Sequence, residues 1–290
     1  KREGNFWKVT VKNVHTGDSQ VVRARFVFVG AGGYALDLLR KAGVPEVHGY
    51  AGFPISGMWL KTTNQELVQQ HKAKVYGKAK VGAPPMSVPH LDLRVVDGEE
   101  SLLFGPYGGW SPKFLKQGSY LDLFKSIRFD NIPSYLGVAA TNIDLVKYLV
   151  SEVFRDFDGK VDMLHEYYPA ADGKDWEVVV AGQRVQVIKP AAFPRFGSLE
   201  FGTTLVNDQN GTIAGVLGAS PGASITPAAM IELLERCFGE HMIDWSDKLH
   251  EMFPTYGKAL KRDKAAYEEQ WEWTQKTLGL DTDENHLGNA

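Results

Sequence analysis

The sequence is poor in cysteine and has no long apolar run. Its 290 residues include one cysteine, Cys237, which excludes an internal disulfide framework and favours a reducing compartment. No apolar run approaches the roughly 18 residues that a membrane-spanning helix needs. The formal net charge is only −3, which gives no reason to expect a nucleic-acid partner.

Familiar catalytic and metal-binding spacings are missing as well. The eight histidines do not recur at metal-ligand spacing, and neither G-x-S-x-G nor H-E-x-x-H occurs. We therefore expect no metal. Cys237 lies in an apolar run typical of a helix, which favours a buried, inert thiol over a catalytic one.

The order of the predicted elements indicates a mixed α/β (α+β) fold. Strand patterns occur early, a strand-rich block and then a helix-rich block follow, and strand patterns return late in the chain. A chain that leaves an α/β layer and comes back to it favours two interleaved domains. Single strands are predicted over residues 6–14, 20–29, 178–188 and 212–217, and helices over 34–41, 142–157 and 227–238.

Gly30, Gly32 and Gly33 fall between a predicted strand and a predicted helix. Residues 30–35 formally match G-x-G-x-x-A, a turn that can place a phosphate at a helix N-terminus. No strand ending in Asp or Glu follows about 20 residues later, as the complete fingerprint requires. We interpret the turn as a later strand–helix connection near the adenosine end of a dinucleotide. A tight turn without a ligand is the alternative.

A run of small residues precedes the last predicted strand-following helix. Thr226 is predicted as the N-cap of that helix and Pro227 as its first residue. Small residues let backbone amides approach a flat ligand, and a helix N-terminus stabilises the negative charge of a reduced flavin. A loop that is merely packed against neighbouring helices is the alternative. The candidate cofactor-binding residues here are Gly218, Ser220, Gly222, Ala223 and Ser224.

His90, Asp92 and Arg94 occupy alternate positions, so a strand would place all three on one face. A histidine held by a carboxylate suits a base at neutral pH, and an arginine suits a carboxylate clamp. A surface ladder of alternating charge is the alternative. Tyr107 and Trp110 are candidate pocket walls or ordinary packing residues.

Five motifs resemble those of malate:quinone oxidoreductases in order, spacing and wording, and the similarity covers nearly all of residues 1–280. The resemblance implies FAD-dependent oxidation of (S)-malate to oxaloacetate in the tricarboxylic acid cycle, with electrons passed to membrane quinone. It also implies a two-dinucleotide-domain flavoprotein-like fold. The motifs are FVFVGAGGYA at 26–35, MSVPHLDLR at 86–94, LFGPYGGW at 103–110, AGQRVQVIK at 181–189 and GVLGASPGA at 215–223.

The resemblance also implies a division of the chain and two further site residues. Residues 1–48 and 191–240 are expected in the FAD-binding domain, 49–190 in an antiparallel-sheet substrate domain with a helical insert, and 241–290 in a helical tail. By similarity to amino-acid oxidases, Arg184 is expected to grip a substrate carboxylate. Lys189 is a weaker electrostatic candidate.

Two other functions stay open: a 2-hydroxyglutarate oxidase of the same class, and a cofactor-free interaction module. An NAD-linked malate dehydrogenase is disfavoured because no complete dinucleotide fingerprint precedes an acidic strand end. Because quinone is lipid-soluble, we expect peripheral contact with anionic lipid on the cytoplasmic face of the inner membrane. The candidate contact is residues 245–264 with Trp271 and Trp273, or else the insert at 120–136; packing of these apolar residues on the protein is the alternative.

The family's N-terminal βαβ unit with its glycine fingerprint is not found in this sequence. We therefore predict that residues 1–290 alone bind FAD weakly or not at all and are inactive. Flavin absorbance after gel filtration of the purified chain tests this. Retention of stoichiometric flavin would contradict it.

Overall fold

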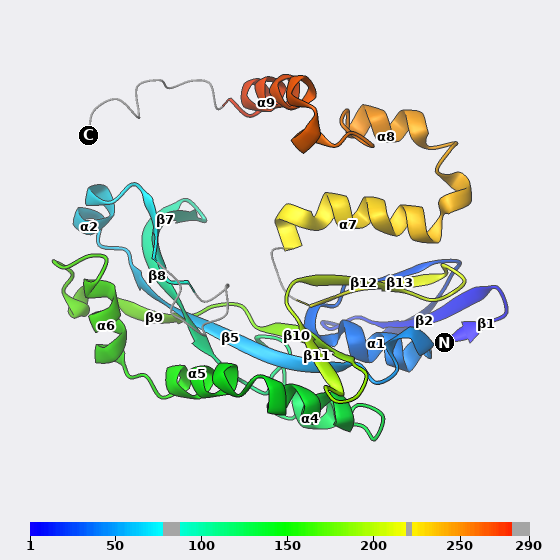
Figure 1. Cartoon of the computed structure of the whole chain (residues 1–290), viewed down its shortest axis with the longest axis horizontal. Coiled ribbons are helices and arrows are strands. Elements are labelled where there is room, and N and C mark those ends of the chain that lie inside the picture. The colour runs from blue at the N-terminus through cyan, green and yellow to red at the C-terminus, as the bar shows by residue number, and fades with distance from the viewer. Residues whose placement is uncertain (78–87, 219–221, 280–290) are drawn as a thin grey trace. The chain divides into compact units, whose positions relative to one another are not determined.

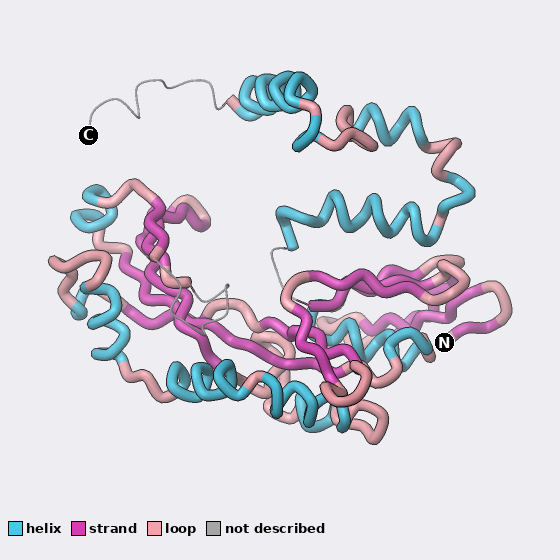
Figure 2. Tube along the Cα trace, in the orientation of Figure 1, coloured by secondary structure: helices cyan, strands magenta, loops and turns pink. Residues whose placement is uncertain are grey.

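The computed structural model describes residues 1–77, 88–218 and 222–279 (Figure 1). The chain divides into two compact units, Lys1–Leu233 and Leu234–Ala290. The first unit holds all of the strands and most of the helices in the described part of the chain. It combines helices with three sheets, so the predicted mixed α/β class is confirmed (Figure 2).

The first strands form a small antiparallel sheet. It contains β1 (Arg2–Glu3), β2 (Phe6–Lys12) and β3 (Ser19–Ala24). The predicted single strand over 20–29 is wrong, because the chain leaves this sheet after Ala24. Val27–Val29 forms a separate strand, β4, in another sheet. No glycine or proline stands between the two strands, so the sequence does not reveal the change of partner.

The second sheet contains one parallel pair of strands. There β4 pairs in parallel with β13 (Ile213–Gly218), which forms a hairpin with β12 (Thr203–Asn207). Short helix α1 (Ala35–Ala42) follows β4 and buries Leu36 and Leu39 in the apolar core beside this sheet.

The largest sheet is antiparallel and has seven strands. Its main path runs β11-β10-β5-β8-β7-β6, and β9 also pairs with β5. The predicted strand over 178–188 is wrong in one respect, since residues 181–183 separate β9 from β10. The bounds are β5 (Ala51–Thr62), β6 (Lys74–Tyr76), β7 (His90–Val96), β8 (Glu99–Gly109), β9 (Glu177–Val180), β10 (Arg184–Pro190) and β11 (Gly197–Glu200).

Helices of the insert run along this sheet, where α4 contacts β10 and β11 and α5 contacts β8 (Figure 1). Asn64 caps the helix after β5 by accepting a hydrogen bond from the backbone N–H of Glu66. A second apolar core, which includes Leu60, Phe104 and Leu164, lies between the sheet and its helices. The bounds are α2 (Gln65–Gln70), α3 (Asp122–Ser126), α4 (Ile132–Thr141), α5 (Ile143–Val153) and α6 (Phe157–His165).

The second unit is helical. Helix α7 (Gly222–Cys237) enters it, and α8 (Ser246–Met252) and α9 (Lys264–Leu278) follow. The prediction that Thr226 is the N-cap is wrong, because α7 begins at Gly222 and contains Pro227 in its interior. Nothing in the Gly-Ala-Ser-Ile sequence prevents helical dihedral angles, so the helix extends one turn beyond the expected cap. Cys237 is partly buried.

Gly33 is required by the packing of the chain on itself. A Cβ atom at this position would overlap the carbonyl oxygen of Phe114 and lie 2.8 Å from Cγ2 of Val185. We predict that Gly33→Ala lowers the free energy of unfolding by about 1–3 kcal/mol, the usual cost of overpacking. Urea denaturation measures this value.

Gly182→Ala is the matched control, because a Cβ atom there meets no heavy atom within 4 Å. It is expected to change stability by less than about 0.5 kcal/mol. Equal stabilities of the two variants would show that the overlap at Gly33 is relieved at no cost.

Candidate active site

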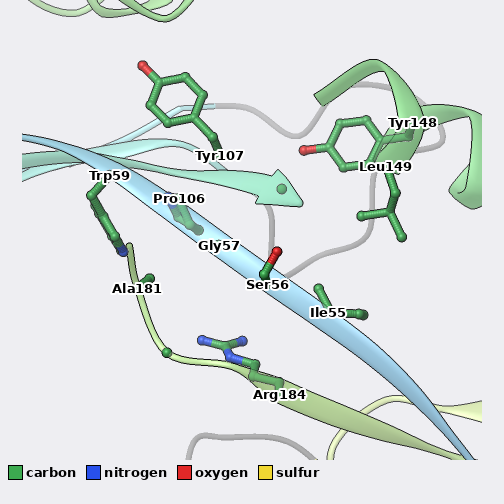
Figure 3. A pocket seen from close by; sticks show the side chains of 12 residues that line it. Ile55, Ser56, Gly57, Trp59, Pro106, Tyr107, Tyr148, Leu149, Ala181 and Arg184 are labelled. Atoms are coloured by element: carbon green, nitrogen blue, oxygen red, sulfur yellow. The ribbon is translucent and has the colours of Figure 1, made fainter. Parts of the chain in front are cut away.

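A cavity forms where one edge of β5 changes partner. On this edge β5 pairs with β10 from Ala51 to Ile55 and with β9 from Met58 to Lys61. Between these ladders the linker 181–183 crosses β5, and the backbone N–H of Ala181 donates to the carbonyl of Gly57 at 2.8 Å. The interruption leaves a cavity of about 100 Å³ (Figure 3). Its lining residues are Ile55, Ser56, Gly57, Trp59, Pro106, Tyr107, Gly108, Tyr148, Leu149, Ala181, Gly182 and Arg184.

Arg184 is the one charged residue among the described residues that line this cavity. It is the first residue of β10 and lies opposite Ile55 in the register. Its guanidinium makes no hydrogen bond or ion pair with the described part of the chain. In Figure 3 it lies on the same side of β5 as Trp59 and Ala181. A partly buried guanidinium with unused donors is suited to bind a carboxylate.

The predicted group His90, Asp92 and Arg94 lies on β7, and the structure joins two of its members directly. Nε of Arg94 donates to Oδ2 of Asp92 at 3.0 Å, and Nζ of Lys74 lies 3.2 Å from the same oxygen. Asp92 is 3% exposed, so its carboxylate is a buried anion between two cations. Such pairing offsets the cost of burying the charge.

His90 is not held by Asp92 in the described structure. Its Nδ1 lies 3.2 Å from the carbonyl oxygen of Val88, and its ring stacks on Tyr76 with centroids 4.6 Å apart. Burial is the main cause that lowers the pKa of His90, and it outweighs the opposing effects of Val88 and Asp92. A histidine in this environment is neutral at pH 7.

Trp59 connects this group to the cavity. Trp59 lines the cavity. Its ring makes a T-shaped contact with the ring of His90, with the centroids 4.8 Å apart. The guanidinium carbon of Arg94 lies over the same ring, 4.8 Å from its centroid. The structure thus places His90 and Arg94 one aromatic ring away from the Arg184 cavity. Sequence reasoning missed Trp59, whose single signal was a large aromatic residue within a glycine-containing strand.

Of the three remaining predicted residues, one lines this cavity and two lie elsewhere. Lys189, five positions along β10 from Arg184, does not line the cavity and has its Nζ 3.9 Å from a carboxylate oxygen of Glu200. Tyr107 is a cavity wall, and its hydroxyl donates to the carbonyl oxygen of Lys160 at 2.7 Å. Trp110 lines a separate apolar cavity.

The two glycine-rich turns follow the carboxyl ends of β4 and β13 in the β12-β13-β4 sheet. The parallel register aligns Val29 with Gly215, so Gly30–Gly33 and Gly218 follow at the carboxyl ends of neighbouring strands. Parallel α/β sheets bind dinucleotides at the carboxyl ends of their strands. Gly30, at this end of β4, is exposed. The small residues there are therefore compatible with a dinucleotide such as FAD.

Not every glycine in these turns needs a ligand to explain it. Gly33 is crowded by Phe114, and Gly218 has a φ of +92° with the carbonyl oxygen of Gly202 where a Cβ would stand. Gly32 has a φ of +55°, which also favours glycine. Ser220 lies outside the described residues. Gly222, Ala223 and Ser224 form the first turn of α7, and the side chains of Ala223 and Ser224 lie outside the described part as well.

The described residues contain no group of three His, Cys, Asp or Glu side chains placed to hold a metal ion. Within the same residues, none of the helices combines the length and the apolar character that crossing a bilayer demands.

The model of the malate:quinone oxidoreductase (Mqo) family matches residues 1–280. The chain belongs to this family. It is 73% identical over 282 residues to a probable malate:quinone oxidoreductase of Corynebacterium aurimucosum, covering 97% of this chain and 56% of that protein. It is 71% identical over 281 residues to the malate:quinone oxidoreductase of Corynebacterium glutamicum, with the same coverage of 97% and 56%. The predicted family is confirmed.

This chain spans about half the length of the malate:quinone oxidoreductases that it matches. Among solved structures, it is similar to an FAD-dependent oxidoreductase from Pseudomonas aeruginosa at 13% identity and a TM-score of 0.36, over 73% of this chain and 46% of that one. A likeness this weak carries no argument about the site.

The environment of His90 predicts a pH dependence of stability. Because its pKa is lowered in the folded state, the unfolded chain binds the proton more readily as the pH falls through about 6.5. Stability is therefore lost as the pH falls through that value, until the folded pKa is reached. We predict a larger loss between pH 7.5 and 5.5 in the parent chain than in His90→Gln, measured by urea denaturation. Equal losses would contradict the buried neutral histidine.

Proposed function

We propose that this chain supplies the substrate-binding part of a flavoenzyme that oxidises (S)-malate to oxaloacetate and passes the electrons to membrane quinone. The observation that supports it most concerns Arg184, which is the charged residue in the cavity wall. Its guanidinium makes no hydrogen bond or ion pair with the described part of the chain. Malate is a dicarboxylate, and a guanidinium binds a carboxylate through two parallel hydrogen bonds. The names of the relatives point to the same substrate and acceptor.

The reaction requires a cation for the carboxylate, a group that takes the hydroxyl proton, and an acceptor for the C2 hydride. Bound FAD supplies the hydride acceptor. Arg184 holds the carboxylate and orients C2, while the Trp59 ring and its neighbours exclude water from one side. His90, being neutral, is the proposed proton acceptor. The ion pair between Asp92 and Arg94 holds the strand that carries it. Lys189 contributes positive charge from outside the cavity.

The domain arrangement proposed from the sequence assigns FAD contacts to residues 1–48 and 191–240 and the substrate to 49–190. The parallel β4–β13 pair supports it, because β4 lies in 1–48, β13 lies in 191–240, and the two form one sheet. Gly30, Gly32, Gly33 and the 218–224 run would then lie along the cofactor. We place the enzyme on the cytoplasmic face of the membrane and in the tricarboxylic acid cycle.

Substitution of Arg184 tests the proposal in the full-length enzyme. Arg184→Ala should raise the KM for malate more than tenfold, since a hydrogen bond to a charged group contributes about 1.5–3 kcal/mol and tenfold equals about 1.4 kcal/mol. Arg184→Lys should restore part of the loss. Steady-state kinetics with a soluble dye as acceptor measures both.

Lys189→Ala is the comparison on the same strand, where the lysine already pairs with Glu200. We expect it to have the smaller effect. An unchanged KM in Arg184→Ala would remove Arg184 from the site. Higher kcat/KM for 2-hydroxyglutarate than for malate in the parent enzyme would favour the alternative substrate.

A further inference from the structure

A second cavity of about 290 Å³ lies between the helices of the insert and the large sheet. Phe53 of β5, Ile188 of β10 and Val146 of α5 are among its walls, together with Trp110, Leu123 and Leu136. No charged side chain lines it among the described residues. A volume near the lower end of the range for small-molecule sites, with apolar walls, suits one aromatic or quinonoid ring.

The cavity opens within an apolar surface. Leu136 and Val146 line it and are nevertheless 65% and 39% exposed, and Phe124 of α3 is 58% exposed. Ile143 and Val150 of α5 are exposed as well. Contiguous exposure of this kind is rare on soluble proteins and marks a surface that contacts another apolar phase.

The segment that leads into this surface and carries α3 has more positive than negative residues. Residues 110–131 contain four Lys or Arg and two Asp or Glu. Both acids bind the protein itself: Asp122 accepts from the hydroxyl of Tyr34 at 2.8 Å, and Asp130 accepts from the backbone N–H of Gly49 at 3.1 Å. Lys125 and Arg128 are exposed, and Nε of Arg128 also pairs with Oδ1 of Asp130 at 3.3 Å. An apolar surface with exposed cations at its border complements an anionic bilayer.

The apolar cavity is adjacent to the Arg184 cavity along three elements. On β5, Phe53 and Pro54 line the former and Ile55 and Ser56 the latter. On α5, Val146 precedes Tyr148 by two residues, and Ile188 and Arg184 are on β10. A ligand that enters the apolar cavity from the apolar surface would therefore bind next to the Arg184 cavity, where the proposed substrate malate binds.

We propose that the apolar cavity takes the ring of a lipid-borne quinone and that the exposed surface of α3–α5 around it lies against an anionic bilayer. This inference rests on the proposed function. In the overall reaction malate loses the C2 hydride and the hydroxyl proton, and the quinone gains two electrons and two protons to become the quinol. FAD, when bound, would carry the electrons between them.

The C-terminal tail fits this role less well. Residues 234–279 contain nine Asp or Glu against seven Lys or Arg. Lys248 pairs with Glu251 at 2.8 Å and Lys264 with Glu268 at 3.5 Å, so part of its positive charge is already neutralised. Leu249, one of the apolar residues expected to face lipid, is buried.

Two neighbouring alanines of α4 provide a matched test of the cavity. Ala139 lines it and Ala140 does not, yet both are exposed. In the full-length enzyme, malate oxidation is measured with decylubiquinone and, separately, with dichlorophenolindophenol. The ratio of quinone-linked to dye-linked kcat/KM should fall at least fivefold in Ala139→Phe and less in Ala139→Leu, and stay within twofold of the parent in Ala140→Phe.

The two acceptors separate failure of this inference from failure of the proposed function. A parent enzyme that reduces neither acceptor with malate would refute the proposed function. An unchanged ratio in Ala139→Phe, or an equal fall in Ala140→Phe, would refute the quinone cavity while leaving malate oxidation intact.

Flotation with phosphatidylglycerol vesicles tests the surface. The double variant Phe124→Glu/Leu136→Glu should remain at the bottom of the gradient, while Val14→Glu, at an exposed apolar residue far along the chain, floats like the parent. The variant of the tail with Lys258, Lys261, Arg262 and Lys264 changed to Glu should also float.

Loss of flotation in the tail variant alone would place the membrane contact in the tail. If the double variant floats and instead splits an oligomer in sedimentation, the surface is an interface between copies. Either result overturns the proposal.

Discussion

The change of partner along one edge of β5 is the constraint on which the Arg184 cavity depends. Its first half is bonded to β10 and its second half to β9, so the linker 181–183 must cross at Ser56 and Gly57. If β9 and β10 were one continuous strand, the ladder would close and Arg184 would occupy an ordinary position in it. The interruption instead leaves Arg184 at the start of a strand, with its guanidinium beside a cavity.

The same strand separates polar from apolar chemistry. Around Ile55 and Ser56 the walls include a cation, whereas around Phe53 and Pro54 they are apolar. A charged substrate and an apolar acceptor would each find one compatible cavity. Under the proposed function, the two cavities would bring a water-soluble donor and a lipid-soluble acceptor close together on one sheet.

The sequence predicted the class of the fold and several strands because alternation and glycine turns are local signals. It missed the break after Ala24, where no glycine or proline marks the change of hydrogen-bonding partner, and the break after Val180, although Gly182 lies in that linker. It also missed Trp59, whose importance lies in contacts with His90 and Arg94 that are distant in the chain. Arg184 was found through family resemblance, and its unused guanidinium became visible only in three dimensions. The His90–Asp92 pair was expected from spacing, but Lys74 of β6 binds the carboxylate instead.

The proposed function depends above all on Arg184 binding a carboxylate of the substrate. Crystals of the full-length enzyme soaked with a non-reacting dicarboxylate such as malonate would show whether it does. We expect electron density for a carboxylate within hydrogen-bonding distance of the Arg184 guanidinium, with Trp59 beside it. Malonate held by other residues, with the Arg184 guanidinium left in solvent, would rule out this role of Arg184.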